Sequence, residues 1–153
     1  MNFALHNEDL RILQAEAQRP RFGRAPGWTA VDWKPTRFGG NMIYLRHVAL
    51  APNCSVERTD IKIEAPPNLY EPVWGGRLAF YRNLWISPGI RIANTKRRMM
   101  PMPRLHGRDA DGFAYLCLHP DPVHPGKNVL DFIKTFDLFL LNPGYKAGFG
   151  EAL

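Results

Sequence analysis

Hydrophobic and polar positions follow a helical period near the amino end of the chain. Apolar residues recur on one side of the segment after Asn7, and the positions between them are mostly polar. Asn7 is a suitable N-cap, and Pro20 stands just beyond the last apolar position. The pattern predicts an amphipathic helix from Asn7 to about Arg19, with its buried side formed by Leu10, Leu13 and Ala17.

The middle of the chain has the shorter period that is typical of β-strands. In TDIKIEA, Ile61 and Ile63 alternate with Lys62 and Glu64, which indicates a strand with one face in water. Similar runs rich in β-branched and aromatic residues are separated by turn residues. We expect a four-stranded antiparallel meander formed by WTAVDW, MIYLRHVAL, TDIKIEA and RLAFYRNLWI.

A second helical stripe lies near the carboxyl end. Gly126 precedes it and Asn142-Pro143 stops it, so the predicted helix extends from about Lys127 to Leu141. No internal repeat or linker interrupts the chain. We therefore interpret residues 1–153 as one α+β domain in the order helix, four strands, loop, helix. The apolar stripe of the second helix consists of Val129, Phe132, Ile133, Phe136 and Leu140.

Composition and charge narrow the class of protein. The chain has 153 residues, the size of one ordinary domain, and it contains neither a long apolar run nor a signal-peptide pattern at its start. We expect a soluble, cytoplasmic protein with no membrane partner. The net charge of +6 favours acidic partners. Nucleic acid is not expected among them, because no known nucleic-acid-binding motif accompanies the basic residues.

The two cysteines must be judged separately. Cys54 and Cys117 are 63 positions apart (117 − 54), a spacing that suggests neither a disulfide framework nor a cysteine zinc site. Cys117 lies near the end of the apolar part of FAYLCLHPD, and Leu118 separates it from a predicted loop that contains three prolines. It is either a small core residue or a nucleophile at the end of a strand. We assign no role to Cys54.

This order of elements, with three local matches, resembles the ubiquitin-conjugating enzyme family. The third predicted strand runs into a proline corner, IEAPPNLYEP, and His106 precedes Cys117 by 11 positions (117 − 106), where the family has its flap. The stop at Asn142-Pro143 lies 26 positions after the cysteine (143 − 117). The flap asparagine of the family has no match in HGRD, and the last two helices of the family are missing. This trimmed form is similar to divergent bacterial members, some of them linked to phage defence.

The resemblance implies a cysteine-dependent transferase. Cys117 would carry the C-terminal carboxyl of a ubiquitin-like modifier as a thioester and pass it to a target amine. His119 and Asp121, two and four residues after the nucleophile, are expected to guide that amine. His106 is expected to shape the flap around the site.

Partners follow from the same resemblance. They are a ubiquitin-activating-like enzyme, the modifier and the target protein. Arg11 and Arg19 of the first helix are expected to bind the activating enzyme. Arg108, or a backbone N–H near the cysteine, would replace the missing oxyanion donor. No metal or organic cofactor is expected, since ATP is used by the activating enzyme.

Other interpretations of these residues remain open. Cys117, His119 and His124 with His106 form a possible zinc set, although their spacing matches no common module. A Cys-His hydrolase is a related option. A non-catalytic binding module with the same fold is another alternative, and a basic nucleic-acid-binding domain that uses Lys96, Arg97 and Arg98 is the last.

Overall fold

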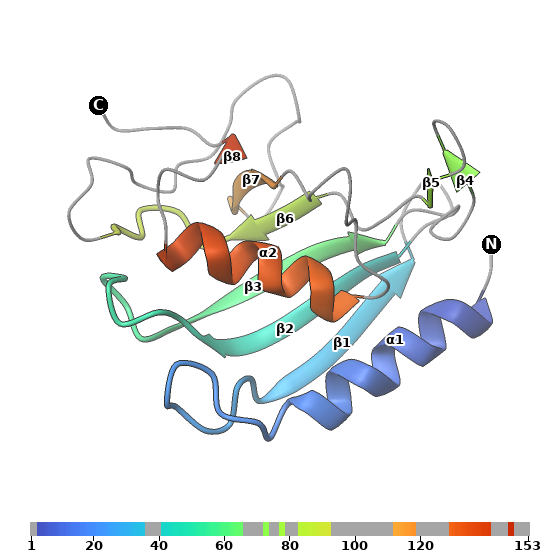
Figure 1. Cartoon of the computed structure of the whole chain (residues 1–153), viewed down its shortest axis with the longest axis horizontal. Helices are drawn as coiled ribbons and strands as arrows, with labels where there is room; N and C mark the ends of the chain where they lie inside the picture. Colours follow the sequence, from blue (N-terminus) through green and yellow to red (C-terminus); the bar gives the residue numbers. More distant parts are fainter. Residues whose placement is uncertain are drawn as a thin grey trace.

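The computed structural model describes residues 3–35, 41–65, 72–73, 77–78, 83–92, 112–118, 129–141 and 147–148. In these residues, helices α1 (Phe3–Glu16) and α2 (Val129–Leu141) accompany an antiparallel sheet of order β1-β2-β3-β6-β7-β8 (Figure 1). The predicted α+β class is confirmed. The strands are β1 (Ala30–Pro35), β2 (Asn41–Ala49), β3 (Arg58–Ala65), β6 (Asn83–Ile86), β7 (Ala114–Leu118) and β8 (Ala147–Gly148). A separate hairpin pairs β4 (Pro72–Val73) with β5 (Arg77–Leu78).

Helix α1 has the predicted buried side but begins earlier than predicted. It starts at Phe3, so the expected N-cap role of Asn7 is wrong; no glycine or proline interrupts the residues before Asn7. Leu13 is fully buried and Ala17 nearly so. The Trp28 indole N–H donates to the Leu13 carbonyl at 2.9 Å, which ties the helix to the segment before β1.

The first strands of the sheet form the predicted meander. Strand β2 pairs with β1 and β3, and its buried positions alternate with partly exposed ones up to an irregularity between Leu45 and Val48. The cross-strand pairs Ile43↔Ile63 and Leu45↔Ile61 line the face that α2 covers. All four of these residues are buried. Of the predicted fourth strand RLAFYRNLWI, the described residues Arg77–Leu78 form β5 of the separate hairpin, and Asn83–Ile86 form β6, which pairs with β3 in the sheet.

The sheet is also larger than the predicted four strands. Strand β7 pairs with β6 through Leu84↔Leu116 and Ile86↔Ala114, and the two-residue β8 pairs with β7. All four residues of those β6–β7 pairs are fully buried, so apolar packing favours the extra strand. The four-strand prediction is therefore corrected, and Cys117 belongs to the sheet.

Helix α2 closes the core, as its apolar stripe predicts. It lies across one face of the sheet (Figure 1), and Phe136 at its centre is fully buried. Phe139 adds to the predicted stripe. The core therefore joins both helices to one face of the sheet.

An ion pair that is far apart in sequence connects α2 to the turn after α1. The Arg21 guanidinium donates two hydrogen bonds to Asp137, at 2.9 and 2.7 Å, and its Nε donates to the Ala49 carbonyl at 3.2 Å. The Arg21 side chain is only 11% exposed. Burial raises the pKa of Asp137, while the hydrogen bonds and charge of Arg21 act against this rise.

Substitution of Arg21 by methionine is expected to lower the free energy of unfolding at neutral pH by about 2 kcal/mol, because Asp137 loses charged hydrogen bonds. The loss should shrink as pH falls, since a carboxyl with a raised folded-state pKa is most compatible with the fold when protonated. Urea titrations at several pH values measure this. Arg19→Met is the control, with a loss below about 0.5 kcal/mol, because the Arg19 side chain is 77% exposed and its ion pair among the described residues is the exposed one with Glu16. Equal losses for the two variants would contradict the prediction.

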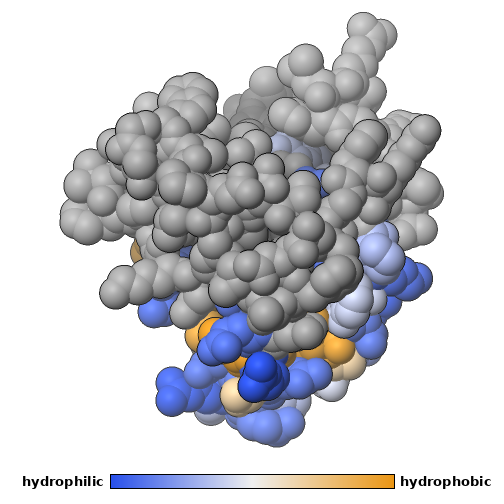
Figure 2. Space-filling model, turned by 90° about the vertical axis from the view of Figure 1, so that its right-hand side faces the viewer, coloured by the Kyte–Doolittle hydropathy of each residue, from blue (hydrophilic) through white to orange (hydrophobic). Residues whose placement is uncertain are grey.

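The described surface is mixed in character. The face at the right-hand side of Figure 1 is mostly hydrophilic where it is described, with smaller hydrophobic areas between (Figure 2). Neither of the two described helices, α1 and α2, is long and apolar enough to cross a membrane. Four large apolar side chains in the described residues are well exposed: Trp33, Val56, Leu138 and Leu141.

Candidate functional site

The backbone of Cys117 is held on both sides within the sheet. Cys117 lies opposite Asn83 of β6 and opposite Gly148 of β8, one residue before the end of β7. The preceding residues of this strand, Ala114 to Leu116, are buried. The strand therefore gives the cysteine a fixed position directly before the loop that the sequence predicts to form the site.

The other predicted site residues are not brought together by the described part of the chain. His106, Arg108, His119 and Asp121 lie outside the described residues, as do the alternative zinc ligand His124 and the basic run 96–98. Within the described residues, no group of histidine, cysteine and acidic side chains could hold a metal ion. The roles assigned to these residues stay predictions.

Cys54 differs chemically from a reactive thiol. It lies in the turn after β2, where Cys54 and Ile92 form an isolated bridge, and its backbone N–H donates to the Ala51 carbonyl at 3.0 Å. Burial raises the pKa of the Cys54 thiol to about 11, and a hydrogen bond from the Ala51 backbone and the charge of Arg24 only partly oppose the rise. Since the thiolate is the nucleophile, Cys54 is poorly suited to catalysis at neutral pH.

The two predicted partner-binding arginines of the amino-terminal segment are accessible. Arg11 is exposed on α1. The Arg19 side chain, three residues after the helix ends, is 77% exposed and lies 3.5 Å from Glu16. Neither side chain is committed to the core, which leaves both open to a partner.

The sheet face opposite α2 contains a buried cation that the alternating pattern did not reveal. Lys62, predicted to face water, is only 3% exposed. Its ammonium lies 4.4 Å from the Phe113 ring centroid and 5.7 Å from that of Tyr44. Aromatic rings can stabilise an ammonium in this way. The prediction that Lys62 faces solvent is therefore wrong. The alternating sequence pattern contains nothing that distinguishes this buried lysine from an exposed one.

An aromatic pair follows Lys62 across the same face. Trp85 lies in register with both Lys62 and Tyr115, and the Trp85 and Tyr115 rings pack edge to face with centroids 5.6 Å apart. Both residues are buried. The strand that bears Cys117 is therefore packed on both faces where its side chains are described.

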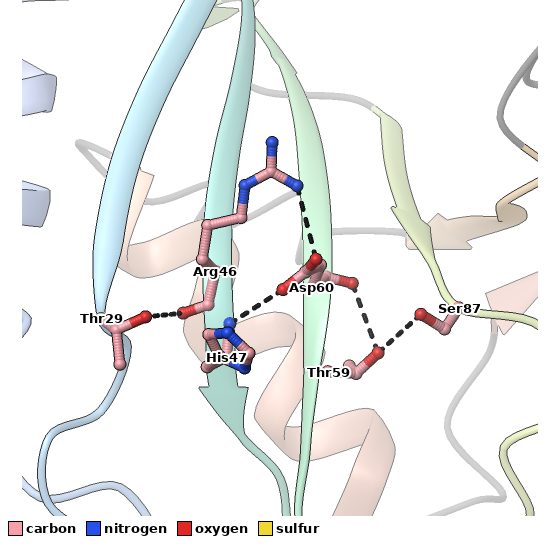
Figure 3. Close-up of polar contacts among 6 residues, drawn as sticks. All are labelled: Thr29, Arg46, His47, Thr59, Asp60 and Ser87. Carbon is pink, nitrogen blue, oxygen red and sulfur yellow. Dashed lines mark hydrogen bonds and ion pairs between the residues drawn. The ribbon is translucent and has the colours of Figure 1, made fainter.

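A polar cluster surrounds the irregularity in β2. Asp60 accepts the His47 backbone N–H at 2.9 Å and lies 3.4 Å from the Arg46 guanidinium, while Thr59 and Ser87 share a 2.8 Å hydrogen bond (Figure 3). His47 has a positive φ of 51°, and Asp60 satisfies the amide that the bulge leaves outside the ladder. This cluster stabilises the bulge and has a structural role.

Comparisons with known proteins found no relative of this chain. No protein-family model, no curated protein and no solved structure matches the chain.

Proposed function

We propose that this protein is a cysteine-dependent acyl transferase of the ubiquitin-conjugating type. Cys117 would accept the C-terminal carboxyl of a ubiquitin-like modifier as a thioester and pass it to an amine of a target protein. The observation that carries the proposal is the position of Cys117, in the sheet and one residue before the end of β7. A nucleophile anchored by a rigid strand and followed by a loop can be presented to a large substrate.

The proposed chemistry is two successive acyl transfers. The Cys117 thiolate attacks the carbonyl carbon of the modifier thioester on the activating enzyme, and the thiolate of that enzyme leaves. The target amine then attacks the new thioester, an amide forms, and the Cys117 thiolate leaves. The amine must lose a proton, and we assign the guidance of that step to His119 and Asp121. In this proposal His106 shapes the flap and Arg108 assists the oxyanion.

The second cysteine supports this assignment by contrast. With a pKa of about 11, Cys54 would be ionised in roughly one molecule in three thousand at pH 7.5. An unperturbed thiol would be ionised in about one molecule in ten at that pH. The proposal therefore assigns the nucleophile to Cys117 and not to Cys54.

The α+β order of elements also supports the proposal. A helix, an antiparallel meander, a cysteine-bearing segment and a helix succeed one another along the chain, which is the order that the resemblance implies. Strand β7 within the sheet is a departure from the expected four strands. We extend the proposal to a bacterial cytoplasmic conjugation pathway in phage defence, with Arg11 and Arg19 as contacts for the activating enzyme.

A defined thioester tests the first transfer without the unidentified activating enzyme. The protein is incubated with a fluorescent peptide whose C-terminal carboxyl is a mercaptoethanesulfonate thioester, and the products are separated on a non-reducing gel. The expected result is a fluorescent adduct on the protein that dithiothreitol removes. Absence of any adduct, under conditions in which free cysteine reacts, would favour the non-catalytic binding module.

A further inference from the structure

A small open hollow lies between the end of α1 and one side of α2. Its volume is about 230 Å³. We call it the α1–α2 hollow. Its apolar lining comes from Pro20, Trp28, Leu130 and Ile133, and its charged lining from Glu16, Arg19, Arg21, Lys134 and Asp137.

Arg21 gives the hollow a fixed cationic wall. Its guanidinium is held by Asp137 and by the Ala49 carbonyl, and it lies 5.9 Å from the Trp28 ring centroid. Three of the five guanidinium N–H groups have acceptors among the described residues. The other two N–H groups have no acceptor in the part of the chain that the structure describes and can serve an incoming acceptor, on a side chain that is already 89% buried (100 − 11).

The cations at the rim are held only weakly. Lys134 is 75% exposed and lies 4.0 Å from Asp131, and Arg19 is 77% exposed and lies 3.5 Å from Glu16. Exposed pairs of this kind contribute little free energy, so both cations can turn to an incoming anion. Asp137 is already paired with Arg21. The charged lining residues sum to +1 (three cations, two carboxylates).

The floor of the hollow is suited to an apolar group. Trp28 is 2% exposed, and its indole N–H is already donated to Leu13, so the ring offers only apolar surface. Ile133 is similarly buried. An occupant with an apolar body and one anionic end would match the floor and the cations together.

We propose that the α1–α2 hollow binds a small carboxylic acid with an apolar body, with the acid group near Arg21, Lys134 and Arg19. This binding does not depend on Cys117. The probe is 3-phenylpropionate, and 3-phenylpropan-1-ol is the uncharged control of nearly equal size. A ligand of this size is expected to bind with a dissociation constant of about 1–10 mM.

Two-dimensional ¹H–¹⁵N NMR of the full chain tests the proposal. The acid should give saturable shifts of the Trp28 indole N–H and of amides around the hollow, and the alcohol should bind at least fivefold more weakly. Lys134→Glu should weaken acid binding at least fivefold. Arg91→Glu, an equal charge change at an exposed arginine that does not line the hollow, should alter it less than twofold.

Four results would contradict binding of the acid in the α1–α2 hollow. Equal binding of acid and alcohol, shifts that map away from the hollow, or equal effects of the two charge reversals would each overturn the proposal. The same holds if no saturation is approached at about 50 mM, well above the expected dissociation constant. Retention of the dispersed spectrum in both variants shows that a loss of binding is not a loss of fold.

Discussion

Substitution of Cys117 by alanine is expected to abolish the reductant-sensitive adduct with the peptide thioester, a loss of about a thousandfold or more. The reason is that the acceptor sulfur is removed, and Cys54 cannot replace it while burial keeps its pKa near 11. Gel fluorescence against time, with and without dithiothreitol, measures the rate. The variant should remain folded, since a cysteine-to-alanine change removes a single heavy atom.

Two matched variants make this result specific. Cys54→Ala should form the adduct at the rate of the unsubstituted protein, because Cys54 has no role in the proposed transfer. Cys117→Ser could retain an adduct only as an ester, which dithiothreitol does not remove. A persistent thioester in Cys117→Ala would assign the chemistry to Cys54 and refute the proposed site.

Substitution of Phe136 by alanine is expected to lower the free energy of unfolding by about 3–5 kcal/mol. Phe136 is 0% exposed at the centre of α2, where its ring packs in the core between the helix and the sheet. Alanine would lose the buried area and leave a cavity, because neighbouring strands that are held by ladder hydrogen bonds cannot collapse fully. Urea unfolding followed by circular dichroism measures the loss.

Leu138 provides the control on the same helix. It is 55% exposed, so Leu138→Ala should cost less than about 0.5 kcal/mol. If Phe136→Ala were no more destabilising than Leu138→Ala, α2 would not pack on the sheet as described. A loss of this size for Phe136 is comparable to the whole stability of a marginal domain.

The periodic spacing of apolar residues was sufficient to predict the helices that have one buried side. The stripe through Val129, Phe132 and Phe136 predicts α2 because burial on one side demands that spacing, and the buried residues are those expected. The same reasoning identifies the buried residues Leu13 in α1 and Ala17 directly after its end. The boundaries are less predictable, because several residues at a helix start have similar propensities, as the start of α1 at Phe3 shows.

Features that depend on contacts between distant segments were not predictable. Arg21 and Asp137 are 116 positions apart, and nothing local identifies them as a pair. Lys62 alternates as a solvent-facing residue would, yet it lies over the Phe113 ring. The addition of β7 to the sheet likewise depends on pairing with β6.

The candidate site was predictable only in part. The sequence pattern places Cys117 at a strand end, which the extent of β7 confirms, and the high pKa of Cys54 agrees with the absence of a role for it. His106, His119, Asp121 and Arg108, which the sequence predicts to lie in loops, are outside the described residues. Loop conformation follows from tertiary contacts more than from periodicity, so these roles require experiment.

Iodoacetamide labelling rates of the two thiols in the native protein, resolved by peptide mass spectrometry between pH 6 and 10, measure the reactivity of Cys117 most directly. The proposed function predicts that Cys117 is alkylated with an apparent pKa at or below about 8.5, whereas Cys54 reacts appreciably only above pH 10. Labelling of Cys117 only after denaturation, or more slowly than that of Cys54, would contradict it.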